Sequence, residues 1–177
     1  MTLFGRLRML LLRTIAYLID SFILFILVIC GFQILLLFTG LHPFVGRTID
    51  SIGANELHIW VFTTVTIPIF VYFVTMFNTR AQATLGMRAV KLRIKSQVRV
   101  GMGKAMLRAF VLLIPWELTH IALFYPIPIF NDPHIFRPLL FVSGTVTLFY
   151  WAFPLLNKHG RGVHDWAAAT NIAKWDT

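Results

Sequence analysis

Residues 10–32 read LLLRTIAYLIDSFILFILVICGF, an apolar stretch interrupted by two charged side chains, Arg13 and Asp20. As a helix rising 1.5 Å per residue, the stretch is long enough to cross a bilayer core of about 30 Å. A charged side chain at the centre of such a helix costs roughly 2.5–3.5 kcal/mol. Seven residues separate the two charges, which places them on one helix face with Ala16 and Tyr17 between them. We therefore predict a polar stripe that faces the protein interior or a watery cavity.

The composition of the whole chain is that of an integral membrane protein. Hydrophobic residues make up 58% of its 177 residues and charged residues 13%, and its mean hydropathy is +0.76. A soluble domain of this size is much less apolar. Cys30 is the single cysteine, which excludes an intrachain disulfide framework. The first apolar stretch is too long and too charged for a signal peptide, and we expect it to be retained.

Apolar periodicity predicts an all-α membrane protein with a single domain, residues 1–177. We expect four transmembrane helices, at about residues 9–38, 57–77, 105–125 and 138–156. They are joined to a basic loop, residues 78–104, and followed by a tail, residues 157–177. Prolines within the spans suggest kinks.

The basic residues alternate along the chain. There are three through residue 13, one in residues 39–56, seven in residues 78–104, one in residues 126–137 and three in the tail. By the positive-inside rule, both termini and the basic loop lie in the cytoplasm, and we expect a plasma-membrane protein of the bacterial inner-membrane type. Topology thus explains most of the net charge of +9, and without a basic soluble surface we predict no nucleic-acid partner.

The basic loop contains a strand pattern. Residues 90–95, VKLRIK, alternate apolar and basic side chains, and Val98 and Val100 resume the alternation. This favours a short β-hairpin lying along the membrane. Its outer face would contact anionic lipid head groups through three cations, Lys91, Arg93 and Lys95. The alternative is that these charges serve only as the topological signal.

Three parts of the chain resemble one family. They are residues 13–20 (RTIAYLID), residues 84–94 (TLGMRAVKLRI) with residues 103–108 (GKAMLR), and residues 161–170 (RGVHDWAAAT). In this order they resemble the patterns of the RDD family of membrane proteins, named for one arginine and two aspartates. The family's Gly-Gln before the threonine is replaced here by Gln82-Ala83. The resemblance implies a small multi-span bundle and a transport function.

The resemblance also implies site residues. It makes Arg13, Asp20 and Asp165 the named charges, and its patterns add four secondary candidates: Thr84, Gly86, Arg88 and His164. Tyr17, which lies in the polar stripe, is a further secondary candidate. From the topology we expect Arg13 to pair with Asp165 at the cytoplasmic rim, with Asp20 deeper, so that these three charges form a polar pocket at the cytoplasmic side. Carboxylates at membrane depth are natural proton or cation sites, because burial penalises the bare charge. Two structural alternatives stay open: a static Arg13–Asp20 ion pair, and Asp165 as the N-cap of a short helix.

A second polar pair lies in the third predicted span. Glu117 and His120 are three residues apart and share a helix face. At or beyond the bilayer midplane they could relay protons outward from Asp20. Equally, they could lie near the outer surface and snorkel to water.

The tail suggests an interfacial helix. Trp166 and Trp175 enclose three alanines, which is typical of an amphipathic segment at the membrane surface, and we expect a helix over residues 166–174. His159 and His164 with Asp165 offer too few ligands for a metal site in a turn, so we predict none.

No catalytic constellation stands out, and we expect neither an enzyme nor a cofactor. The leading hypothesis is a small transporter or ion-coupled carrier whose stripe binds a cation or a proton, in exchange for one another. The rival is a non-transporting scaffold or subunit of a membrane complex. Four spans enclose little volume, so transport would favour a homo-oligomer.

Overall fold

The computed structural model describes residues 2–95, 99–131 and 137–175. It contains four helices long and apolar enough to cross a membrane, as the sequence predicts. The first span joins α1 (Leu3–Leu24), a π-helical segment η1 (Phe25–Phe32) and α2 (Gln33–Phe38); the second joins α3 (Ala54–Val61), a π-helical segment η3 (Phe62–Thr66) and α4 (Ile67–Asn78). The third is α6 (Met102–Phe124) and the fourth is α7 (Pro138–Leu156). A single 3₁₀ turn, η2 (Ile49–Ser51), lies between the first two spans.

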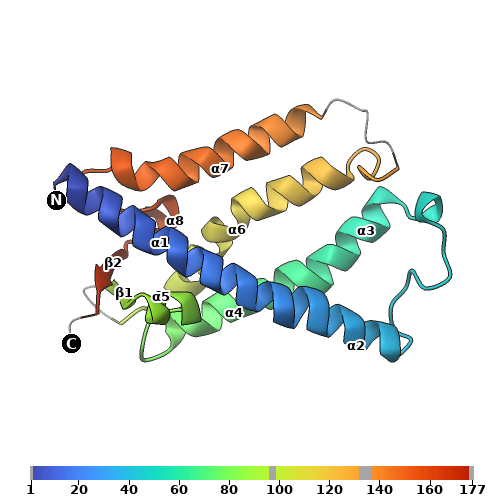
Figure 1. Cartoon of the computed structure of the whole chain (residues 1–177), viewed down its shortest axis with the longest axis horizontal. Coiled ribbons are helices and arrows are strands. Elements are labelled where there is room, and N and C mark those ends of the chain that lie inside the picture. The colour runs from blue at the N-terminus through green and yellow to red at the C-terminus, as the bar shows by residue number, and fades with distance from the viewer. Residues whose placement is uncertain (1, 96–98, 132–136, 176–177) are drawn as a thin grey trace.

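Both described ends of the chain lie at the same end of the bundle (Figure 1). We call this the proximal end, and the opposite end, which carries residues 39–53 and 125–131, the distal end. Helices α1 and α7 meet near the proximal end and diverge toward the distal end, with α6 between α7 and α4 (Figure 1). The outer surface is apolar: Phe22 and Leu148, for example, are 66% and 68% exposed. Such a surface is suited to lipid rather than water.

A small cap of short elements covers the proximal end. It consists of α5 (Leu85–Ala89), β1 (Leu92–Lys95), α8 (Val163–Ala167) and β2 (Asn171–Lys174). The two strands pair antiparallel, with Leu92 opposite Lys174 and Lys95 opposite Asn171. Leu92 and Ile94 are buried beneath this sheet. The cap therefore joins the basic loop to the tail.

The sheet corrects the predicted hairpin. A strand is present within residues 90–95, at Leu92–Lys95, but its partner is the tail strand Asn171–Lys174. The nearest paired residues, Lys95 and Asn171, are 76 positions apart in the sequence. Val100 is buried outside any strand, and Val98 lies outside the described residues. Local alternation identifies a strand and its buried face, but not the segment that pairs with it.

The tail corrects the predicted interfacial helix over residues 166–174. Helix α8 ends at Ala167, and Ala169 adopts a positive φ of 51° that a helix cannot continue. The Thr170 amide then donates to the Asp165 carbonyl (2.8 Å), and the chain turns into β2. The alanines favour a helix by propensity, but pairing with β1 determines the structure here.

Candidate functional site

Asp165 is the centre of a buried charge network at the proximal end. Its side chain is completely buried and forms ion pairs with Arg13 Nη1 (2.9 Å to Oδ2) and with Arg108 Nη1 through Oδ1. The Gly162 amide also donates to Asp165 Oδ2 (2.9 Å), and Arg108 donates to the Thr170 hydroxyl (2.7 Å). One carboxylate thus links α1, α6 and α8.

This geometry confirms that Arg13 and Asp165 approach each other. It revises the capping alternative, because the residue before the first helical residue of α8 is Gly162, and Asp165 caps the helix from its third position. The N-cap role predicted for Asp165 is therefore wrong, although its side chain accepts the hydrogen bond from the Gly162 amide at the start of α8. Burial opposes its ionisation, but Arg108 and Arg13 outweigh that effect and hold the pKa of the Asp165 carboxyl well below its usual range.

Asp20 forms a separate set of contacts, deeper in α1. Its carboxylate accepts hydrogen bonds from the hydroxyls of Tyr72 (2.6 Å) and Thr84 (2.6 Å) and from the Gly86 amide (2.8 Å). Within the described residues no cation lies at ion-pair distance from Asp20. The alternative of a static Arg13–Asp20 ion pair is therefore wrong: Arg13 is engaged with Asp165 instead.

Gly86 allows α5 to press directly against α1. A Cβ atom at this position would overlap the Ala16 carbonyl and lie 2.9 Å from Asp20 Cγ. Thr84 is the N-cap residue of α5, and its hydroxyl accepts a hydrogen bond from the Met87 amide (3.1 Å). The sequence T84-L-G86 therefore brings a hydroxyl and a free amide to the same carboxylate.

Asp20 and the two arginines line one small cavity. Its volume is about 10 Å³, and its lining includes Arg13, Tyr17, Asp20, Thr84 and Arg108. This is room for about one water molecule. Arg13 Nε and Nη2 and Arg108 Nε have no hydrogen-bond partner in the part of the chain that the structure describes. The cavity thus brings one carboxylate and two guanidinium groups to the same small space, among mostly apolar side chains.

Tyr17 and His164 close the network on the side of α7. Tyr17 Oη lies 3.0 Å from His164 Nε2. Burial lowers the pKa of His164 to about 3, since desolvation and the nearby Arg108 and Arg13 outweigh the attraction of Asp165. His164 is therefore neutral at physiological pH.

A sequence model of the RDD family matches residues 8–169, which include most of the chain and every charged residue of this network. The chain belongs to the RDD family. No curated protein and no solved structure matches it. The three parts that resemble the RDD patterns, far apart in the sequence, converge here on one site: Arg13 pairs with Asp165, and Asp20 receives Thr84 and Gly86.

The sequence did not identify Arg108 as a member of this RDD site. It is 1% exposed, it pairs with Asp165, and its guanidinium lies 4.9 Å from the centre of the Phe77 ring. A signal was present: Arg108 ends the GKAMLR segment that matches the family pattern. The spacing of the sequence does not show that the Asp165 carboxylate pairs with a second arginine from α6.

The cations of α5 and β1 are exposed or half-buried. Arg88 is exposed on α5, where it donates to the Ala83 carbonyl (3.2 Å) and lies outside the buried network. Lys91 and Lys95 are exposed and Arg93 is half-buried, at or next to β1. These three cations lie at the proximal end, with the apolar face of β1 turned inward.

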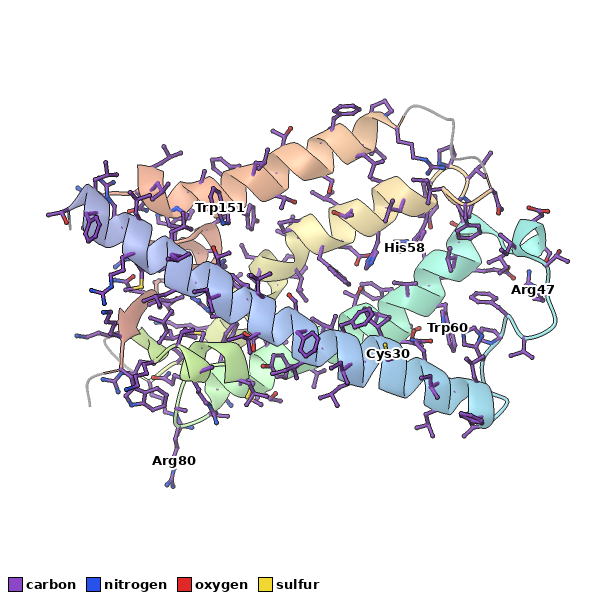
Figure 2. All side chains as sticks on the ribbon, viewed as in Figure 1. Cys30, Arg47, His58, Trp60, Arg80 and Trp151 are labelled. Carbon is purple, nitrogen blue, oxygen red and sulfur yellow. The ribbon has the colours of Figure 1, made fainter. Side chains whose placement is uncertain are left out.

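Glu117 is the centre of a second polar cluster, nearer the distal end. His58 Nε2 lies 2.5 Å from Glu117 Oε1, the Thr66 hydroxyl donates to Oε2 (3.2 Å), and His120 Nδ1 lies 3.7 Å from Oε2. Tyr125 Oη lies 3.3 Å from His58 Nδ1, which extends the chain of polar groups. His58 projects toward α6 (Figure 2). The sequence identified Glu117 and His120 but missed His58, which belongs to another span.

None of these clusters has the arrangement of a metal centre. Among the described residues, no group of three His, Cys, Asp or Glu side chains could hold a metal ion. Two carboxylates within the bundle, the buried Asp20 and the half-buried Glu117, are each surrounded by groups that can donate or accept a proton. The chemistry within reach is therefore proton binding, or coordination of a cation by oxygen atoms.

Proposed function

We propose that this RDD protein is a small ion-coupled membrane carrier that exchanges a proton for a cation at Asp20. The observation that carries the proposal is the burial of Asp20, 2% exposed in a membrane-spanning helix with no cation at ion-pair distance in the described residues. A carboxylate that has hydrogen-bond donors but no counter-charge is still costly in such a place. A bound proton or a bound cation removes that cost.

The groups around Asp20 suit either occupant. Tyr72 and Thr84 contribute hydroxyls, which can donate or accept hydrogen bonds. When Asp20 is ionised, both hydroxyls donate hydrogen bonds to it. When Asp20 is protonated, one hydroxyl can instead accept a hydrogen bond from it. When a cation is bound, the lone pairs of the hydroxyl oxygens can coordinate it together with the carboxylate. Hard cations prefer such oxygen ligands. Because a proton and a monovalent cation carry the same charge, their exchange leaves the total charge of the site unchanged.

Asp165 has a different role in this proposal. Its charge is already compensated by two arginines, so it is less suited to binding an ion. It holds Arg13 and Arg108, which line the cavity, in place by ion pairs, and so fixes α8 against α1 and α6. We infer that opening of α5 away from α1 gives ions access to Asp20, since α5 covers that carboxylate.

Glu117 provides a second proton-binding group in this scheme. It lies nine residues after Arg108 on α6, or about 14 Å further along the helix. His58 and His120 flank it, and imidazoles exchange protons near neutral pH. We propose that this cluster connects the Asp20 region with the distal surface. The contact with His58, on another span, favours this relay over a carboxylate that snorkels to the surface alone.

We assign the proximal end to the cytoplasm, because it carries the basic loop and the tail. In that orientation Lys91, Arg93 and Lys95 lie among anionic lipid head groups. We further propose a homo-oligomer. The cavity at Asp20 has a volume of only about 10 Å³, so a continuous ion path requires surfaces from a second copy or a large opening.

The rival function is a scaffold that uses the same charges to hold helices together. The observation that favours it is the complete satisfaction of Asp165, which links three elements and leaves no oxygen without a partner. The two functions differ at Asp20. A scaffold needs the hydrogen bonds that Asp20 accepts, whereas a carrier needs the negative charge of Asp20.

Proton flux in proteoliposomes tests the proposal. The full chain is reconstituted alone, a Na⁺ or K⁺ gradient is imposed, and internal pH is followed with a trapped dye. Wild type should move protons, and Asp20→Asn should remain folded, as judged by gel filtration, without doing so. Asp50→Asn, an exposed carboxylate at the distal end, is the matched control and should retain flux. Flux equal to wild type in Asp20→Asn, or none in wild type with any alkali cation, would contradict the carrier.

A further inference from the structure

A large groove lies beside the ion site, between α1 and α7. It encloses about 730 Å³, and α4 and α6 form its floor. Its proximal end is closed where the Trp151 indole donates to the Thr14 hydroxyl (3.1 Å) and Arg6 donates to the Leu155 carbonyl (2.6 Å). Toward the distal end the two helices diverge (Figure 1), and Trp151 lies on the side of α7 that faces α1 (Figure 2). The groove therefore opens sideways from a membrane-spanning region.

The lining determines what the groove can hold. Aromatic and aliphatic side chains dominate, including Phe22, Phe25 and Trp116. The polar residues are hydroxyl-bearing or aromatic ones and His164; among the residues that the structure describes, no aspartate, glutamate, lysine or arginine lines the groove. Since His164 is itself neutral, a charged ligand would find no opposite charge here.

His164 supplies an unused polar group at the closed end. The side chain is 8% exposed and lines the groove. Its Nε2 atom contacts Tyr17, while Nδ1 is buried and has no hydrogen-bond partner in the described part of the chain. A buried polar atom without a partner destabilises the folded protein. A ligand head group with one hydroxyl or carbonyl would remove that cost.

We propose that this groove binds an uncharged, single-chain amphiphile from the bilayer, with its chain between α1 and α7 and its hydroxyl or carbonyl head at His164 and Tyr17. The volume is within the 300–1,000 Å³ of ordinary ligand pockets. An irregular peptide segment would bring backbone groups that the apolar walls cannot satisfy. The site is separate from Asp20, so it stands whether or not the protein carries ions.

Photolabelling of the full chain in lipid nanodiscs tests the proposal. The probe is a monoacylglycerol with a diazirine in its acyl chain, and the labelled residues are mapped by mass spectrometry. We expect labelling concentrated on the facing sides of α1, α6 and α7. Unlabelled monoacylglycerol should compete at least tenfold better than phosphatidylglycerol, which has a charged head.

Two pairs of variants sharpen the result. Thr147→Trp fills the groove from α7 and should reduce labelling about tenfold, whereas Leu148→Trp, the neighbouring position that is 68% exposed outside the lining, should not. Ser21→Trp fills it from α1 and serves if the first variant fails to fold. Labelling spread evenly over the outer surface, equal competition by phosphatidylglycerol, or crosslinks between two copies through cysteines at positions 21 and 147 would overturn the proposal.

Discussion

Removing the charge of Asp165 should be the most damaging single change at the proximal end. Asp165→Asn keeps the shape of the side chain but leaves two guanidinium groups, 4% and 1% exposed, without their counter-charge. Loss of one partner from a buried ion pair costs about 3–5 kcal/mol. Arg13→Gln should cost less, about 1.5–3 kcal/mol, because Asp165 retains Arg108 and the Gly162 amide.

The double variant separates pairing from general damage. Arg13→Gln with Asp165→Asn removes one positive and one negative charge together, so its cost should be smaller than the sum of the two single costs by at least about 1 kcal/mol. Exchanging the charges, Arg13→Asp with Asp165→Arg, should not restore stability, because the new arginine would face Arg108. Tryptophan fluorescence during denaturant unfolding in detergent measures each value.

An exposed ion pair gives the matched control. Arg47 and Glu56 lie 2.9 Å apart with side chains 34% and 54% exposed. Arg47→Gln should change the free energy of unfolding by no more than about 1 kcal/mol, since water screens such pairs. Equal losses for Arg47→Gln and Asp165→Asn, or a coupling below about 0.5 kcal/mol between Arg13 and Asp165, would refute the reasoning.

Three further predictions concern packing, pH and topology. Gly86→Ala should separate α5 from α1 and lower the melting temperature sharply, whereas Gly144→Ala, where a Cβ meets nothing within 4 Å, should be tolerated; similar melting temperatures would contradict this. The pKa of His164 is about 3 in the folded protein against an ordinary 6.5, so the unfolded chain binds a proton that the folded chain does not. Stability should therefore fall as pH drops from 6.5 toward 3, and His164→Gln should flatten that fall; an unchanged slope would argue against it. Single cysteines replacing Arg80, which projects away from the bundle (Figure 2), and Ser51 should label from opposite sides of the membrane, and labelling of both from outside would exclude four spans.

The sequence predicts the spans and part of the charge network for one physical reason. Long apolar stretches and the cost of charge in a membrane are local properties, readable from residues 10–32 alone. The approach of Arg13 to Asp165 also followed from the sequence, because the topology assigned both to the same membrane level.

What the sequence missed depends on contacts between distant segments. The pairing of β1 with β2, the contact of His58 with Glu117 and the second arginine on Asp165 each join residues more than 50 positions apart. Neither propensity nor periodicity specifies such partners. The helix predicted for residues 166–174 failed for the same reason, since its local preference for helix is weaker than the pairing with β1.

Infrared difference spectroscopy on the reconstituted protein tests the role of Asp20 most directly. If a cation displaces a proton from this carboxyl, adding Na⁺ or K⁺ should convert a protonated carboxyl signal into a carboxylate signal. Asp20→Asn should abolish that change, while Asp50→Asn should preserve it. The account is contradicted if wild type shows no such conversion with either cation, or if Asp20→Asn shows the same conversion as wild type.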